Sequence, residues 1–128
     1  MKRFHLLFGL LVLVVFLLTG QYMDRFHEHL RYTPDGPRML YRTRHIFILL
    51  SGLLHLGIGS YFVYRTQVWR RALQYLGSVL LAIAPVLLTI GFFYEPNLQG
   101  LYAPLSKKAI IMIAVGALLH VVSGVKEK

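Results

Sequence analysis

Histidines are the residues in this chain best suited to chemistry. Six occur among 128 residues, and four of these, His5, His45, His55 and His120, fall inside or at the edge of long apolar stretches. An ionisable side chain is costly to place at membrane depth, so it indicates either a function or a buried hydrogen bond. The question is then which of these histidines the fold brings together, and for what.

His55 and His120 form the most informative pair. His55 lies 11 residues past Arg44 and His120 lies 12 past Lys108, which is roughly 16–18 Å along a helix in both cases. The two helices would run in the same direction and face each other diagonally across a four-helix bundle. Two imidazoles at one depth could hold the iron of haem b from both sides. Glycines beside them would leave room for a porphyrin, namely Gly52, Gly59, Gly116 and Gly124.

Other uses of these histidines stay open at this point. Each could instead bond a carbonyl or a hydroxyl such as Ser51, Ser78 or Thr89, or line a small channel or transporter. His45 is a weaker cofactor candidate, which with His27 or His29 would make a second, outer site. The chain has no cysteine, which excludes disulfides, iron–sulfur clusters and covalent haem attachment. The identity of any metal is not fixed by the residues.

The elements that would position these histidines are four stretches without Asp, Glu, Lys or Arg. They cover residues 4–23, 45–64, 72–94 and 109–125, and a membrane-spanning helix needs about 17–25 such residues. Lipid offers the backbone no hydrogen-bond partner, and period-2 alternation typical of barrel strands is missing, so the spans should be helices. We expect an all-α, four-helix transmembrane bundle with up-down-up-down order, forming one domain over residues 1–128. The basic start resembles a signal peptide but no A-x-A site follows, which predicts a retained first helix.

Each predicted helix carries small and polar residues on one face, as membrane helices do where they pack together. Pro85 lies in the middle of the third span, where it removes one helical hydrogen bond and should kink the helix. The four faces consist of His5, Gly9, Val12, Phe16 and Thr19; His45, Gly52, His55 and Gly59; Ser78, Ala82, Pro85 and Thr89; and Met112, Gly116, His120 and Ser123.

The first connection, residues 24–44, is the longest and most basic. Tyr22, Phe26 and Leu30 recur every four residues among charged ones, which predicts an amphipathic extension of the first helix. The segment 33–37, Thr-Pro-Asp-Gly-Pro, should end it in a turn. The five arginines exceed what topology requires, so they are candidates for docking an acidic protein surface or anionic lipid head groups. They are Arg25, Arg31, Arg38, Arg42 and Arg44.

Orientation is weakly determined because Lys and Arg divide equally, seven on each side of the membrane. Four of the five acids lie on the side of the first and third connections, which favours both termini in the cytoplasm of a bacterial inner membrane. The tie also permits insertion in both orientations.

Charge and motifs restrict the function. The net charge of +9 lies at the ends of the spans, where lipid head groups bind it, so nucleic acid is not expected. No phosphate loop, zinc-protease motif or nucleophile elbow occurs, and we expect no enzyme. The sequence therefore predicts an accessory or structural membrane subunit that packs with a partner or itself. Alternatives are electron transfer by haem b on His55 and His120, and a small channel or transporter.

Overall fold

The computed structural model describes residues 1–125, and this part of the chain forms four long α-helices and no β-strand. The helices are α1 (Lys2–His27), α2 (Asp35–Tyr61), α3 (Val68–Tyr94) and α4 (Pro104–Gly124), with short 3-10 turns η1 (Glu28–Leu30), η2 (Glu95–Asn97) and η3 (Gln99–Leu101) between them. The predicted all-α class is confirmed.

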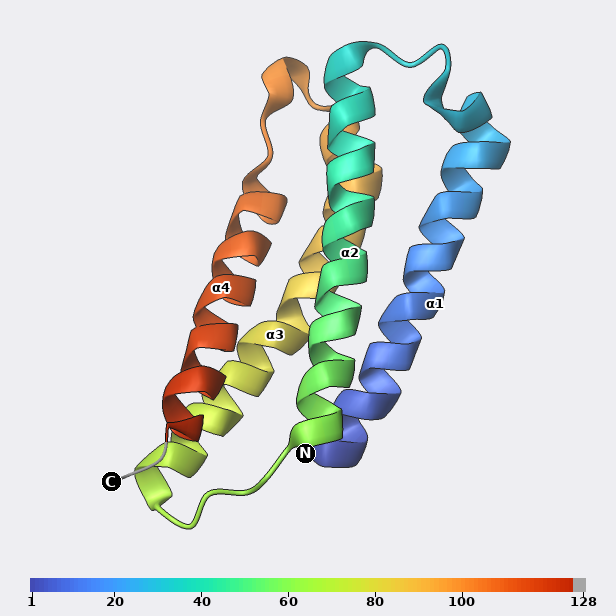
Figure 1. Cartoon of the computed structure of the whole chain (residues 1–128). Coiled ribbons are helices and arrows are strands. Elements are labelled where there is room, and N and C mark those ends of the chain that lie inside the picture. The colour runs from blue at the N-terminus through green and yellow to red at the C-terminus, as the bar shows by residue number, and fades with distance from the viewer. Residues whose placement is uncertain (126–128) are drawn as a thin grey trace.

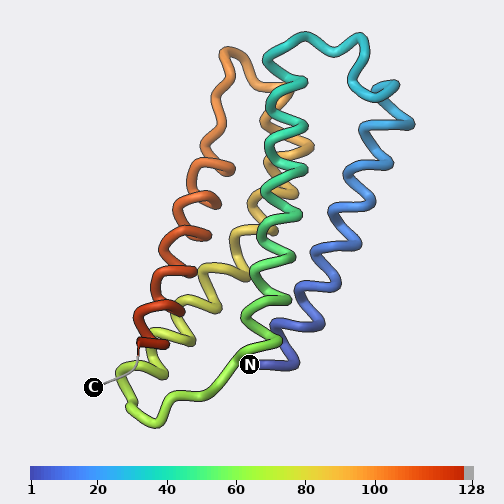
Figure 2. The backbone as a smooth tube through the Cα atoms, in the orientation of Figure 1, coloured from blue at the N-terminus to red at the C-terminus, as the bar shows by residue number. Residues whose placement is uncertain are grey.

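The four helices pack as two pairs. α1 lies mainly against α2 and α3 mainly against α4, while α2 and α3 join the pairs. The α1–α2 and α3–α4 connections lie at one end of the bundle, and the N-terminus lies at the other, beside segment 62–67 between α2 and α3 (Figures 1 and 2). Ile48, Leu81 and Leu88 are fully buried between the helices. Every residue on the four predicted small and polar faces is buried or half-buried.

Three of the four helices, α1, α3 and α4, are long and apolar enough to cross a membrane. α2 has the same length as α3, 27 residues, but it does not belong to this set. α2 contains Asp35 and three arginines in addition to its histidines, and these residues lower its hydropathy. The prediction of a second crossing between residues 45 and 64 therefore remains a prediction.

The ends of α1 and α2 differ from the sequence-based expectation. The amphipathic extension ends early, because Glu28, His29 and Leu30 adopt left-handed φ angles of 47°, 57° and 64°, and Leu30 turns inward to 2% exposure. α2 then begins at Asp35, inside the segment expected to be a turn. Pro37 is compatible with this start, since backbone N–H groups in the first helical turn need no intrahelical acceptor.

Glycines set the distance between the helices of each pair. A Cβ on Gly59 of α2 would lie 2.9 Å from the Leu6 nitrogen of α1. A Cβ on Gly77 of α3 would lie 2.9 Å from the Gly116 oxygen of α4. Only glycine lets the backbones approach this closely, as small residues do in membrane helix pairs generally. These glycines therefore serve close helix packing inside the bundle.

Replacing Gly77 by Ala should destabilise the protein, because the new methyl group would meet both the Gly116 carbonyl and the His120 ring at 2.9 Å. We expect a loss of about 1–3 kcal/mol, the usual cost of overpacking. The matched control is Gly57→Ala, since a Cβ there meets nothing within 4 Å and Ala favours a helix over Gly. Thermal unfolding in detergent measures both, and equal stability of the two variants would contradict the packing described.

Candidate functional site

Two polar clusters inside the bundle each join three or more helices, and the first is a histidine cluster made of His5, His55, Ser78 and His120. His5 Nδ1 lies 2.8 Å from His55 Nδ1, and His5 Nε2 lies 2.8 Å from Ser78 Oγ. His120 Nε2 reaches the same hydroxyl at 3.2 Å. His5 and His55 are fully buried and Ser78 is 2% exposed. All four helices thus contribute to one cluster, and the candidate pair His55 and His120 both belong to it.

His55 bonds a backbone carbonyl that Pro85 leaves without its helical donor. Pro85 has no backbone N–H, so the Leu81 carbonyl one turn earlier lacks its helical donor. His55 Nε2 lies 3.0 Å from that carbonyl oxygen, which only accepts hydrogen bonds, so the imidazole must donate. A buried carbonyl without a hydrogen-bond donor is costly. A side chain on α2 thereby satisfies the gap that proline leaves in α3.

The hydrogen bonds of the cluster allow two arrangements of its protons. Ser78 donates to the Gln74 carbonyl at 2.7 Å, so it accepts from both His5 Nε2 and His120 Nε2. His55 Nε2 also donates, and one further proton lies between the two Nδ1 atoms. The His5–His55 pair then holds three protons and one positive charge. If the Ser78 hydroxyl turns to His5 instead, both rings can be neutral.

The arrangement does not fit a haem between His55 and His120. Both ring nitrogens of His55 already have partners within hydrogen-bond distance. The space beside the glycines is filled, with Leu13 against Gly52, Leu6 against Gly59 and Leu81 against Gly116, while Gly124 faces Arg65. Within residues 1–125, no three His, Asp or Glu side chains are arranged to hold a metal ion.

His45 lies apart from the histidine cluster. Its Nδ1 is 2.8 Å from Thr19 Oγ1, and its ring stacks on Phe16 with centroids 4.1 Å apart. His29 instead pairs with Asp24 at 2.7 Å on the surface. The expected outer site of His45 with His27 or His29 is therefore not assembled.

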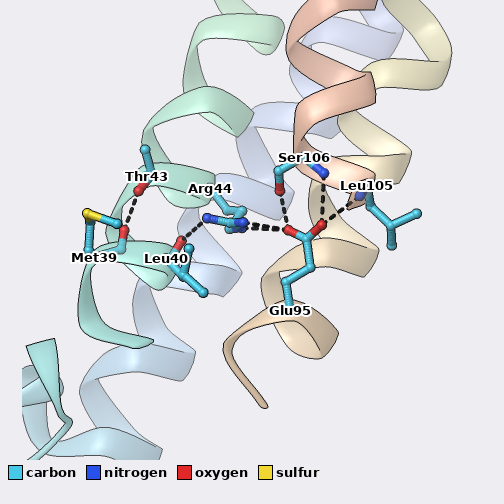
Figure 3. Close-up of polar contacts among 7 residues, drawn as sticks. All are labelled: Met39, Leu40, Thr43, Arg44, Glu95, Leu105 and Ser106. Atoms are coloured by element: carbon cyan, nitrogen blue, oxygen red, sulfur yellow. Dashed lines mark hydrogen bonds and ion pairs between the residues drawn. The ribbon is translucent and has the colours of Figure 1, made fainter. Parts of the chain in front are cut away.

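The second polar cluster lies at the other end of the bundle and centres on Glu95, which is fully buried (Figure 3). Arg44 donates to Glu95 Oε2 from Nη2 at 2.6 Å and from Nε at 2.8 Å. The backbone N–H groups of Leu105 and Ser106 donate to Oε1 at 2.7 and 2.9 Å, and the Ser106 hydroxyl donates to Oε2. Arg44 also reaches the Leu40 carbonyl at 3.2 Å.

Glu95 joins three helices through these bonds. Leu105 and Ser106 lie in the first turn of α4, where N–H groups lack an intrahelical acceptor. A carboxylate there also complements the positive end of the helix dipole. Glu95 therefore caps α4 while it pairs with α2. From the sequence, Glu95 counts only among the acids on the side of the first and third connections. The available signal for its pairing was an acid directly after one span and an arginine directly before another.

The structure corrects the assignment of Arg44 to a docking surface, because Arg44 is 4% exposed and bound to Glu95. Arg38 is also engaged, donating to the Thr33 carbonyl at 2.8 Å and lying 3.5 Å from Asp35. Arg25, Arg31 and Arg42 are exposed. The five candidate arginines thus fall into different environments that their spacing in the sequence did not distinguish.

Glu95→Gln should strongly destabilise the fold, because it leaves the Arg44 charge buried without its partner. Breaking one side of a buried pair costs about 3–5 kcal/mol. The matched control is Glu28→Gln, an exposed acid in the first connection. Denaturant unfolding followed by circular dichroism measures both. Adding Arg44→Met to Glu95→Gln should recover part of the loss, and equal unfolding of Glu95→Gln and Glu28→Gln would contradict this reading.

Comparison with known proteins gives no relative from which a role could be carried over. No protein-family model matches this chain, and neither a curated protein nor a solved structure matches it.

Proposed function

We propose that this protein is a four-span integral membrane protein, ordered up-down-up-down, that acts as an accessory subunit by docking an acidic protein partner. The docking surface would be the bundle end that carries the α1–α2 and α3–α4 connections. The observation that carries the proposal is the excess of exposed positive charge at this end after all internal pairing.

The charges at this end pair unequally. Sequence segments 24–44 and 95–108 hold seven Lys or Arg residues and four acids. Glu95 is bound to Arg44, Asp35 lies beside Arg38, and Asp24 pairs with His29. Glu28 is the remaining acid. The exposed basic residues are Arg25, Arg31, Arg42, Lys107 and Lys108, and all except Arg25, which lines a separate groove, form what we call the basic patch. A surface of this kind attracts an acidic partner and speeds its docking.

The residues inside the bundle favour a docking role and not transport or electron transfer. Between the two polar clusters Ile48, Leu81 and Leu88 are fully buried, and the buried Ser51 hydroxyl is bound to the Ile48 carbonyl. A channel would need polar groups or water along its length. The polar groups of the histidine cluster bond one another and neighbouring backbone carbonyls, which suits a role in holding the helices together.

The proposed topology includes α2 as a crossing helix. Its 27 residues are long enough to span, and its histidines face inward, where polar residues of membrane helices are found. Four crossings place both termini on one side, which we propose is the cytoplasm of a bacterial inner membrane. The basic patch then faces the opposite side.

Single cysteines test this topology directly, since the chain has none of its own. Tyr32→Cys and Gln99→Cys, in the first and third connections, should react with a membrane-impermeant maleimide from one side. Thr66→Cys, in the second connection, should react only from the other side. All three positions are exposed. Labelling of positions 32 and 66 from the same side would mean that α2 does not cross.

A photo-reactive phenylalanine at Tyr32 tests the docking. Tyr32 is 76% exposed and adjoins Arg31; the control position is Tyr61, 88% exposed at the other end of α2. In native membranes the probe at 32 should give an adduct whose mapped peptide is rich in Asp and Glu, and high salt should suppress it. Arg31→Gln with Arg42→Gln should reduce the adduct several-fold, while Arg3→Gln should not.

Three outcomes would contradict the docking. The first is no adduct from position 32 beyond that from position 61. The second is an adduct that persists unchanged with Arg31→Gln and Arg42→Gln. The third is an adduct that maps to this chain itself, which would replace the acidic partner by a second copy.

A further inference from the structure

A groove runs along the outside of the bundle between α1 and α3. Its middle is a recess of ≈ 250 Å³ lined by Val12, Val15, Pro85 and Val86 among others. A hollow of ≈ 390 Å³ follows toward the end of α1, and Val15 lines both. Another of ≈ 290 Å³ lies at the opposite end, near the N-terminus. The recess and the hollow toward the end of α1 share Val15 and Thr89 and form one continuous groove, and the third hollow lies along the same two helices.

The chemistry of the groove changes along its length. The recess is lined by apolar side chains and Thr89, and the Thr89 hydroxyl is bound to the Pro85 carbonyl at 2.7 Å. The adjoining hollow adds Gln21, Tyr22 and Arg25. Arg25 is exposed and lies just beyond the predicted span 4–23, at the level where lipid phosphates are found. The groove is thus apolar at depth and cationic at one mouth.

We propose that this groove binds an anionic phospholipid, with one acyl chain in the recess and the phosphate on Arg25. Val15 is ten residues from Arg25, which is about 15 Å along α1 and equals half of the ~30 Å hydrocarbon layer. A chain that starts at Arg25 therefore reaches the recess at the middle of the bilayer. A guanidinium binds phosphate through two parallel hydrogen bonds, which favours an anionic head group.

The dimensions of the groove favour an acyl chain over a transmembrane helix. A helix with its side chains is about 10 Å across and ~30 Å long, many times larger than the ≈ 250 Å³ recess. The lipid proposal rests on the proposed membrane insertion of α1 and α3 but not on partner docking. The cysteine labelling tests the insertion and the photo-cross-link tests the docking, so a failure of either can be told apart from a failure of lipid binding.

Native mass spectrometry of the full chain tests the proposal. The detergent-purified protein is given equal amounts of phosphatidylglycerol and phosphatidylcholine with identical acyl chains. One phosphatidylglycerol should be retained in preference, and Arg25→Gln should reduce its retention about fivefold. The charge control is Arg31→Gln, exposed at the same end. Val86→Trp should fill the recess and displace the chain, while Val14→Trp, at an equally exposed position (both 50%) outside the groove, should not.

Several results would overturn the lipid site. Equal retention of the two lipids would remove the head-group preference. An equal loss with Arg25→Gln and Arg31→Gln would reduce the effect to general surface charge. Equal retention in Val86→Trp and Val14→Trp would place the acyl chain elsewhere.

Discussion

The Leu81 carbonyl, left open by Pro85, is where the two helix pairs are tied together at depth. His55 from α2 donates to it, His5 bonds His55, and Ser78 bonds His5. Inside the bundle, away from water, an open carbonyl and a buried imidazole each cost free energy, and both costs fall when they bond to each other. This fixes the relative position of α2 and α3, and α1 and α4 bond to the same cluster through His5 and His120.

Glu95 joins neighbouring helices at the opposite end of the bundle. Its carboxylate binds the Arg44 side chain of α2 and the first N–H groups of α4, so the end of α3 is joined to two neighbours. The fully buried Ile48 and Leu88 lie between the two polar clusters, and glycine contacts set the spacing within each pair. Two directional anchors with apolar packing between them specify one register more strongly than apolar contacts alone.

The bonds inside the bundle determine which arginines remain exposed to bind other molecules. Arg44 is bound to Glu95 and Arg38 to the first connection, whereas Arg31 and Arg42 stay at the surface. Arg25 differs again, because the divergence of α1 from α3 leaves a groove that ends beside it. The proposed partner and the proposed lipid would therefore use different arginines of one basic segment.

The sequence by itself determined the helical class, because long uncharged stretches and helical faces are local patterns of residue type and spacing. The faces that it marked as internal, such as His5 with Gly9 and Ser78 with Pro85, are buried or half-buried. It also placed His55 and His120 at one depth. Only the tertiary structure decided that His55 bonds Leu81 and His5, that Glu95 turns inward to Arg44, and that a groove opens between α1 and α3. These facts depend on which helices are neighbours and how far apart they lie, and residue spacing within one helix carries no information on either.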